Sequence, residues 1–166
     1  MRAHLSTATL VVAAFSAICA PAAATLPRTF VASFGTDTGS CTAPAPCRSF
    51  TFAITQTTAG GELIVADTAG YGPVTINQAV SIVAPPGVYA GVTVTSGDGI
   101  KINASPSDDV VLRGLTINGA GGARGIVVLS AASVHIDGVV VSGFLQGIDV
   151  NPTVAVDVFI SDSVVR

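Results

Sequence analysis

The stretch VVLRGLTING at residues 110–119 returns twice further along the chain at a constant step, so that the copies begin at Val110, Val134 and Val158. The second copy is VHIDGVVVSG at 134–143, and the third is VFISDSVVR at 158–166. The copies match position by position in three columns, which hold Leu112, Ile136 and Ile160; Gly114, Gly138 and Asp162; and Ile117, Val141 and Val165. A residue type that returns at a fixed step is typical of a solenoid, in which each coil lies on the previous one.

A second series of repeats lies between these copies and advances with them. The segments GIKI, GIVV and GIDV begin at Gly99, Gly125 and Gly147, so their step is slightly longer and then slightly shorter than that of the first series. Upstream, GVTVTSG at Gly91 resembles GLTINGA at Gly114, again at a similar step. We interpret the small changes of step as length changes in the turns between coils.

The composition and the strand pattern together indicate the fold class. The chain is 49% apolar and 10% charged, with 18 glycines, and Val, Ile and Thr far outnumber the helix formers Lys, Glu and Gln. From Glu62 onward, short strands alternate with Gly, Pro, Asn and Asp, and no helical pattern interrupts them, which excludes a βαβ fold. An antiparallel sandwich has no reason to repeat one pattern at a constant step. We therefore predict an all-β fold, a right-handed parallel β-helix of about four to five coils over residues 62–166.

The alternation of side chains in these strands predicts which residues face the core. Leu112 and Ile117 are expected to point into the coil and stack. The outward positions are polar, and they include Arg113, Thr116, His135 and Asp137.

Residues 25–61 are predicted to form an N-terminal cap on the solenoid. Arg28 to Ser33 alternates like a short strand, and the following segment has one apolar helical face with Ser49 as a possible N-cap. That face consists of Phe50, Ala53, Ile54 and Thr57. We expect the short helix to stop at Gly60-Gly61 and to close the end of the β-helix, since unpaired strand edges invite aggregation.

Residues 1–24 have the layout of a secretory signal peptide. A positive start, Met1-Arg2-Ala3-His4, precedes an apolar run from Leu10 to Ala20 and a small-residue segment with cleavage expected after Ala24. The apolar run is short for a transmembrane helix, which needs about 20 residues. We therefore expect a protein that is secreted, periplasmic or on the cell surface, with no membrane span after signal cleavage.

Two cysteines remain after the signal, Cys41 and Cys47 in CTAPAPC. An even number of cysteines in an exported chain favours a disulfide, and two prolines restrict the loop between them. A metal site is the alternative, but no histidine lies nearby and only two sulfurs are present. We expect a disulfide that orders the N-terminal segment.

Several segments resemble a known family. They are RTFV at residue 28, the Cys41/Cys47 pair leading into RSF, TAGGEL, and VSIVAPPGVYAG. With these features, residues 28–166 resemble exported bacterial right-handed β-helix repeat proteins of the pectin-lyase-like superfamily. The resemblance implies fold and export but little about a reaction. It also implies that further coils continue beyond Arg166, so that the β-helix is truncated at its C-terminus.

Charge and residue chemistry restrict the function. The formal net charge is −3 and no basic run exists, so we expect no binding to nucleic acid. Carboxylates that could act in pairs on a polysaccharide are scattered. Asp137 shares an outward column with Arg113 and Ser161, and the other acidic candidates are Asp108, Asp109, Asp149, Asp157 and Asp162. None makes a convincing pair, so we predict no catalytic residue.

The remaining candidates point to structural roles. SPSDD at 105–109 lacks known calcium-loop spacing, and His135 has no cysteine or serine partner, so we predict no metal site and no cofactor. GAGGARG at 119–125 lacks the Gly-Lys-Ser/Thr ending of a phosphate loop and is expected to be a turn. Tyr71 and Tyr89 could stack on a sugar, although half-buried roles are commoner for such residues. Thr93 and Thr95 form a single Thr-x-Thr pair, too few for an ice-binding surface.

Two hypotheses for the function follow. The leading one is an exported β-helix module without catalysis, which binds a polysaccharide or another cell-surface partner. The alternative is a polysaccharide lyase or glycoside hydrolase whose catalytic coils are absent from this chain. Coils with stacked Asp, Arg or Lys on one outer face would favour the enzyme.

Overall fold

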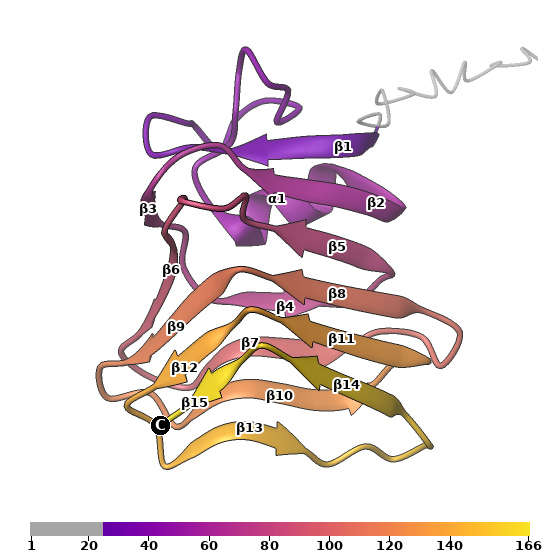
Figure 1. Cartoon of the computed structure of the whole chain (residues 1–166). Coiled ribbons are helices and arrows are strands. Elements are labelled where there is room, and N and C mark those ends of the chain that lie inside the picture. Colours follow the sequence, from indigo (N-terminus) through magenta and orange to yellow (C-terminus); the bar gives the residue numbers. More distant parts are fainter. Residues whose placement is uncertain (1–24) are drawn as a thin grey trace, which may run out of the picture.

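The computed structural model describes residues 25–166, which form a parallel β-solenoid with three sheets and one short helix (Figure 1). The six-stranded sheet contains β1 (Leu26–Val31), β2 (Thr57–Val65), β5 (Val80–Val83), β8 (Asp109–Arg113), β11 (Ser133–Asp137) and β14 (Asp157–Ser161). The five-stranded sheet contains β3 (Ala69–Gly70), β6 (Ala90–Val94), β9 (Leu115–Gly119), β12 (Val140–Ser142) and β15 (Val164–Val165). The four-stranded sheet contains β4 (Val74–Ile76), β7 (Asp98–Asn103), β10 (Arg124–Ser130) and β13 (Gln146–Val150).

Every strand pair within these sheets is parallel, and the chain visits the three sheets in turn. The prediction of an all-β parallel solenoid is therefore confirmed, whereas the right-handed sense of the coil stays a prediction. The signal peptide predicted at residues 1–24 lies outside the described residues. Within residues 25–166, no helix has the length and apolar character needed to cross a bilayer.

The apolar columns found in the sequence form the core. Leu112 pairs with Ile136 and Ile136 with Ile160, while Ile117, Val141 and Val165 align in the neighbouring sheet. Leu112, Ile117 and Ile136 are fully buried. Burying a side chain of this size contributes about 1.5–3 kcal/mol, so a column that recurs in every coil supplies much of the stability of the solenoid.

The column of Gly114, Gly138 and Asp162 lies at the corner between the six-stranded and the five-stranded sheets. All three residues have a positive φ, of 70°, 61° and 49° respectively. Glycine adopts this conformation without strain, and aspartate is one of the few other residues that tolerate it. At Gly114 a Cβ atom would also lie 2.7 Å from the carbonyl oxygen of Ala84, so this corner needs glycine for space as well.

The structure corrects one alignment in the upstream coils. Gly91 pairs with Thr116, and Val92 pairs with Ile117, so the step between β6 and β9 is longer than the predicted step from Gly91 to Gly114. Matching Gly91 with Gly114 was wrong because Gly91 lies within β6, next to the Tyr89 ring, and not at a corner. The two-residue strand β3 was also missing from the strands read from the sequence.

The predicted helix exists as α1 (Phe50–Gln56), and the Ser49 hydroxyl accepts a hydrogen bond from the Phe52 amide at 3.2 Å as its N-cap. Phe50 and Ile54 are buried as expected. The helix ends at Gln56, however, before the predicted stop at Gly60-Gly61. Those glycines belong to β2, where pairing with β1 is irregular and where a Cβ on Gly61 would collide with the Pro27 carbonyl.

In chain order, α1 lies between two strands of the six-stranded sheet, β1 and β2, and packs on β4. It therefore takes the place that a strand of the four-stranded sheet occupies in the later coils (Figure 1).

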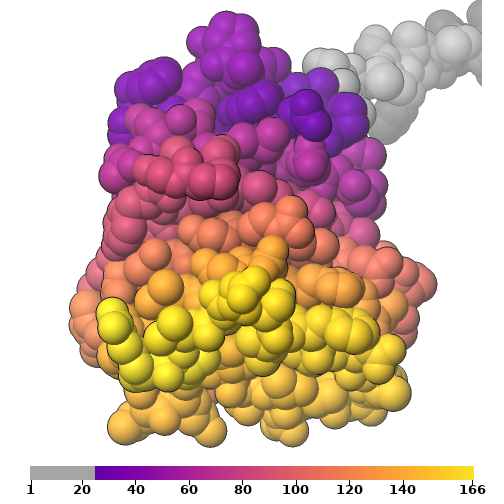
Figure 2. Space-filling model, in the orientation of Figure 1, coloured from indigo at the N-terminus to yellow at the C-terminus, as the bar shows by residue number. Residues whose placement is uncertain are grey.

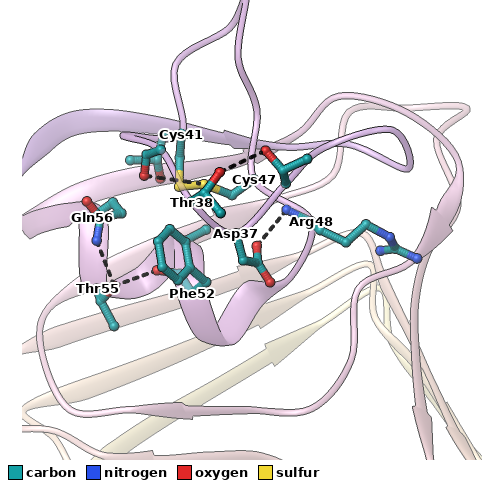
Figure 3. Close-up of a disulfide and its surroundings, with 12 residues drawn as sticks. Asp37, Thr38, Cys41, Cys47, Arg48, Phe52, Thr55 and Gln56 are labelled. Atoms are coloured by element: carbon teal, nitrogen blue, oxygen red, sulfur yellow. Dashed lines mark hydrogen bonds between the residues drawn. A yellow bond between two sulfur atoms is a disulfide. The ribbon is translucent and has the colours of Figure 1, made fainter.

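The predicted disulfide between Cys41 and Cys47 is present, and both residues are fully buried (Figure 3). The loop that it closes lies along the free edge of β1. The Phe30 amide donates to the Cys41 carbonyl at 2.7 Å, the Cys47 amide donates to the Phe30 carbonyl at 2.9 Å, and the Ala32 amide donates to the Cys47 carbonyl at 2.9 Å. The loop therefore satisfies the backbone groups that an edge strand would leave open.

Candidate functional site

A hollow of about 460 Å³ lies where α1 meets the outer face of the four-stranded sheet. We call it the α1 hollow. It is lined by Thr51, Ile54, Thr55, Pro73, Val74, Thr75, Asn77, Asp98 and Lys101. It exists because a helix replaces a strand in the first coil, so the outer surface steps in between α1 and the strands β4 and β7. A volume of this order is typical of small-ligand sites.

Some polar groups of the α1 hollow already form hydrogen bonds within the protein, whereas others do not. On the α1 side, the Thr51 hydroxyl donates to the Pro73 carbonyl at 2.8 Å and keeps its acceptor capacity. The Thr55 hydroxyl donates to the Phe52 carbonyl at 2.7 Å and already accepts from the Gln56 amide at 3.0 Å, so its oxygen keeps one further acceptor position. On the sheet side, Asn77 and Lys101 make no side-chain hydrogen bond or ion pair with any other residue of the described part of the chain. The hollow therefore offers acceptors from α1 and unengaged donors from β7 and the end of β4.

Thr75 and Lys101 are neighbours in register on β4 and β7, and both face outward. Adjacent strands lie about 4.8 Å apart, so the two side chains stand side by side on the floor of the hollow. Ile54 and Val74, which are 7% and 4% exposed, contribute small apolar patches beside them. The hollow thus combines hydroxyl, amide and ammonium groups with apolar surface.

Asp98 lies at the edge of the hollow, and Arg124 holds its carboxylate. The Arg124 guanidinium donates to both oxygens of Asp98, at 2.7 and 2.8 Å, and to Asp149 at 2.9 Å. Hydrogen bonds from Arg124 first to Asp98 and then to Asp149 raise the pKa of the guanidinium further above its already high ordinary value. Because one cation binds both carboxylates, neither is free to act as the acid or base of a hydrolase.

Asp98 and the pairing role of Arg124 were not predicted from the sequence, although a signal existed. Asp98 and Arg124 directly precede Gly99 and Gly125, so they occupy one column and share the step of those glycines. The register pairs Arg124 with Asp98 on one side and with Gln146 on the other. Asp149 was a candidate from the sequence. Its side chain binds Arg124, although its register partner in the neighbouring coil is Val127.

The outward column of Arg113, Asp137 and Ser161 forms a chain of contacts across the six-stranded sheet. Arg113 donates to Asp137 at 2.9 Å, and the Ser161 hydroxyl donates to the other oxygen of Asp137 at 3.0 Å. The change of residue type at each coil, which looked irregular in the sequence, is therefore complementary. Such exposed pairs contribute little individually, about 0–1 kcal/mol, and they set the register more than they stabilise the fold.

Two of the other outward carboxylates, Asp108 and Asp109, also lie in surface contacts. Asp109 accepts a hydrogen bond from the Ser133 hydroxyl at 2.6 Å, and Asp157 is the next residue along the same column. Asp108 accepts from the Ser105 amide at 3.0 Å within its turn. In residues 25–166 no group of three or more His, Cys, Asp or Glu side chains is placed to hold a metal ion.

His135 and the two tyrosines occupy different environments. His135 stacks on Phe159 in the neighbouring coil, with ring centroids 4.7 Å apart. Tyr89 is 43% exposed and its hydroxyl accepts a hydrogen bond from Asn118 at 3.0 Å. Tyr71 is only 1% exposed and packs against Phe50, so the suggestion that it stacks on a sugar is wrong.

Tyr71 belongs to a polar network beneath the disulfide loop. Its hydroxyl donates to the Asp67 carboxylate, which also accepts from the Ser33 amide at 2.8 Å and from the Ser33 hydroxyl. Burial and the contact with Asp67 raise the pKa of the Tyr71 phenol, while hydrogen bonds from Ser33 and then Tyr71 lower the pKa of Asp67. The network stays ionised at Asp67 and neutral at Tyr71 near pH 7, and it joins the cap to the first full coil.

The glycine-rich segment 119–125 and the threonine pair have structural roles. The segment links β9 to β10, and the Ala120 and Gly122 amides donate to the Val94 carbonyl at 2.8 and 2.9 Å, so it is a turn packed on the coil before it, as predicted. Thr93 pairs with Asn118 in the next coil and thus does not continue a threonine column.

Comparison with protein-family models, with curated proteins and with solved structures finds no match for the chain.

Proposed function

We propose that this protein is an exported β-helix module that binds a glycan in the α1 hollow and does not itself catalyse a reaction. One observation carries the proposal: Asn77 and Lys101 present unengaged hydrogen-bond donors on the floor of a hollow that also contains threonine hydroxyls. A sugar supplies both donors and acceptors on each hydroxyl, so it can use the donors of Asn77 and Lys101 and the acceptors of Thr51 and Thr55 together.

The apolar part of the lining supports the same class of ligand. Pyranose rings have C–H faces, and these can pack against Pro73, the exposed apolar residue of the lining, while the ring hydroxyls meet the polar groups. The hollow is open to one side, which suits a ligand that continues as a chain beyond the bound residue.

The state of the carboxylates favours binding over hydrolysis. Arg124 holds the carboxylates of Asp98 and Asp149, and Arg113 and Ser161 hold the carboxylate of Asp137, so these groups already have partners within the protein. A hydrolase needs one carboxyl group that keeps its proton, which requires burial or a neighbouring negative charge. No observation on the described residues favours the enzyme alternative.

Export and membership of the pectin-lyase-like superfamily are part of the proposal. The parallel solenoid and the Cys41–Cys47 disulfide support them, because disulfides persist in oxidising compartments outside the cytosol.

A glycan array followed by calorimetry on the purified protein tests the proposed binding. We expect Asn77→Ala and Lys101→Met each to weaken binding of the selected glycan about tenfold, since each removes a hydrogen bond to the ligand. Asn103→Ala is the matched control, because Asn103 is an exposed residue of the same strand, β7, outside the hollow lining. An array without a bound glycan, or equal affinities for all variants, would contradict the proposal.

A further inference from the structure

The outer face of the five-stranded sheet differs from those of the other two sheets in its charge. The strands of this sheet, β3, β6, β9, β12 and β15, contain no charged residue. The six-stranded and the four-stranded sheets, in contrast, both carry ion pairs on their outer faces. Arg48 donates to the Gly70 carbonyl at 2.7 Å, but it does so at the edge of β3 that faces away from β6. The strands of the five-stranded sheet therefore offer hydroxyl and amide groups, but no charge, to a ligand on this face.

Tyr89, directly before β6, lies across the outer face of this sheet. A Cβ atom added at Gly91 would lie 2.7 Å from the Tyr89 Cε1 atom and 3.1 Å from the phenol oxygen, so the ring fills the space that a side chain at Gly91 would need. The side of the ring away from the sheet is open, and Tyr89 is 43% exposed. In Figure 2 the segment that leads into β6 lies on the visible surface, between the indigo N-terminal segment and the orange later coils. The ring is therefore accessible to a ligand.

A row of hydrogen bonds across successive coils holds the Tyr89 side chain in place. The Asn118 side-chain amide donates to the Tyr89 phenol oxygen at 3.0 Å, and the Ser142 hydroxyl donates to the Asn118 side-chain carbonyl at 2.9 Å. The Tyr89 backbone amide also donates to the Thr68 hydroxyl at 3.1 Å. Because the phenol oxygen accepts, its own O–H remains a donor for a ligand, and so does the second N–H of the Asn118 amide. A ring that is fixed before binding loses little freedom when a ligand arrives, which favours affinity.

Two threonine side chains border the ring. Thr116 pairs in register with Gly91, and Thr93 pairs with Asn118, so both hydroxyls lie on the same outer face at the spacing of adjacent strands, about 4.8 Å. Thr93 is exposed and Thr116 is partly exposed. Neither hydroxyl makes a hydrogen bond with another residue in the part of the chain that the structure describes. Each hydroxyl therefore offers a donor and acceptors to a ligand that lies on the ring.

We propose that the outer face of the five-stranded sheet binds a neutral polysaccharide, with one pyranose ring stacked on Tyr89. The site consists of Tyr89, Thr93, Thr116 and Asn118, and we call it the Tyr89 platform. The C–H groups of a pyranose are attracted to the negative face of an aromatic ring, while the sugar hydroxyls reach the donors and acceptors beside it. A uronic acid would bring a carboxylate to strands that hold no cation, so a neutral sugar fits better. The platform and the α1 hollow lie on different sheets, so this proposal does not depend on binding in the hollow.

Tyrosine fluorescence tests whether a sugar reaches the platform. The protein has two tyrosines and no tryptophan, and Tyr71 is 1% exposed, so a change of fluorescence on adding a glycan reports on Tyr89. We expect a saturable change on titration with at least one of cellohexaose, xylohexaose and mannohexaose, and none with hexagalacturonic acid. No response to any of the neutral sugars, or a response to the acidic sugar alone, would overturn the proposal.

Calorimetry on variants, with the neutral sugar that responds, tests the stacking itself. Tyr89→Ala and Tyr89→Leu should each weaken binding at least about tenfold, because leucine keeps apolar bulk but no aromatic face. Tyr89→Phe retains the ring and should weaken binding only about threefold. Phe34→Ala is the matched control, since it removes an aromatic ring that is 73% exposed and lies between β1 and α1, outside the platform. Equal affinities for Tyr89→Ala and the unaltered protein would overturn the proposal.

Gly91→Ala moves the Tyr89 ring without removing any group of the platform. The added Cβ forces the ring to shift, and the backbone of Gly91 has no positive φ, so alanine is tolerated there. We expect a loss of affinity close to that of Tyr89→Ala, with a circular dichroism spectrum that matches the unaltered protein. Full affinity in Gly91→Ala would overturn the proposal. So would binding that is lost in Asn77→Ala and retained in Tyr89→Ala, because the sugar would then occupy the α1 hollow.

Discussion

The first and the last described coils of this solenoid differ in how far their strand edges are covered. At the N-terminal end, the disulfide loop bonds the edge of β1 and α1 covers the coil below, so Val31 and Phe50 are fully buried. At the other end, β14 and β15 have the same sequence pattern as the coils before them, yet Ile160 and Val165 are half exposed. Residues at equivalent positions of the repeat therefore contribute unequally to the free energy of unfolding, because the contribution depends on whether another part of the chain covers the coil.

The largest expected difference comes from replacing isoleucine by alanine at equivalent positions of two coils. Ile136→Ala removes a fully buried side chain and should lower the free energy of unfolding by about 2–5 kcal/mol. Ile160→Ala, in the same column at the open end, should cost less than about 1 kcal/mol in dilute protein, because the side chain is 53% exposed. Urea denaturation of both variants gives the two values. Equal losses would show that the last coil is covered in solution.

The closed end should depend on its disulfide. Replacing both Cys41 and Cys47 by alanine should lower the free energy of unfolding by roughly 2 kcal/mol, the value expected for so short a loop. Hydrogen exchange should show faster exchange in β1 and the Cys47 amide, with the amides of β11 unchanged. Uniformly faster exchange throughout the solenoid would contradict a local role for the disulfide.

The smallest expected effect concerns pH at the closed end. Asp37 accepts a hydrogen bond from the Arg48 amide at 2.7 Å (Figure 3). It also accepts from the Ser49 amide at 3.1 Å and from the Ser49 hydroxyl at 2.7 Å. Burial opposes ionisation of this carboxyl group, but these hydrogen bonds outweigh it and lower its pKa below the ordinary 3.8. A lowered folded-state pKa stabilises the protein above pH 3.8, and the contribution is lost as the pH falls through the folded-state value.

Asp37→Asn should therefore destabilise the protein near pH 7, and the difference should shrink as the pH falls below 3.8. Thermal unfolding of both proteins across this range measures the difference. A difference that is independent of pH would mean that the carboxylate charge of Asp37 has no part in holding the loop.

Much of the fold was predictable because stacking imposes the same demand on every coil. Leu112, Ile136 and Ile160 could be aligned by counting residues, and so could the corner residues Gly114, Gly138 and Asp162, whose positive φ explains the choice of glycine and aspartate. Counting residues gives the wrong register where a turn changes length. Gly91 was matched with Gly114 from the resemblance of their segments and a similar step, but Gly91 pairs with Thr116.

The candidate site was much less predictable. The α1 hollow depends on where a helix of seven residues lies relative to β4, and no local pattern specifies that distance. The carboxylates were visible as single residues, but the partners of Asp98 and Asp149 depend on side chains that reach diagonally between coils to Arg124.

The sequence by itself determined the parallel stacking, the buried columns, the capping helix and the disulfide, because repeat step, helical spacing and cysteine count each act locally or at a fixed interval. Only the tertiary structure decided which carboxylates are held by arginine and where the hollow forms. These depend on side-chain reach and on the relative placement of unlike elements, which no periodic pattern encodes.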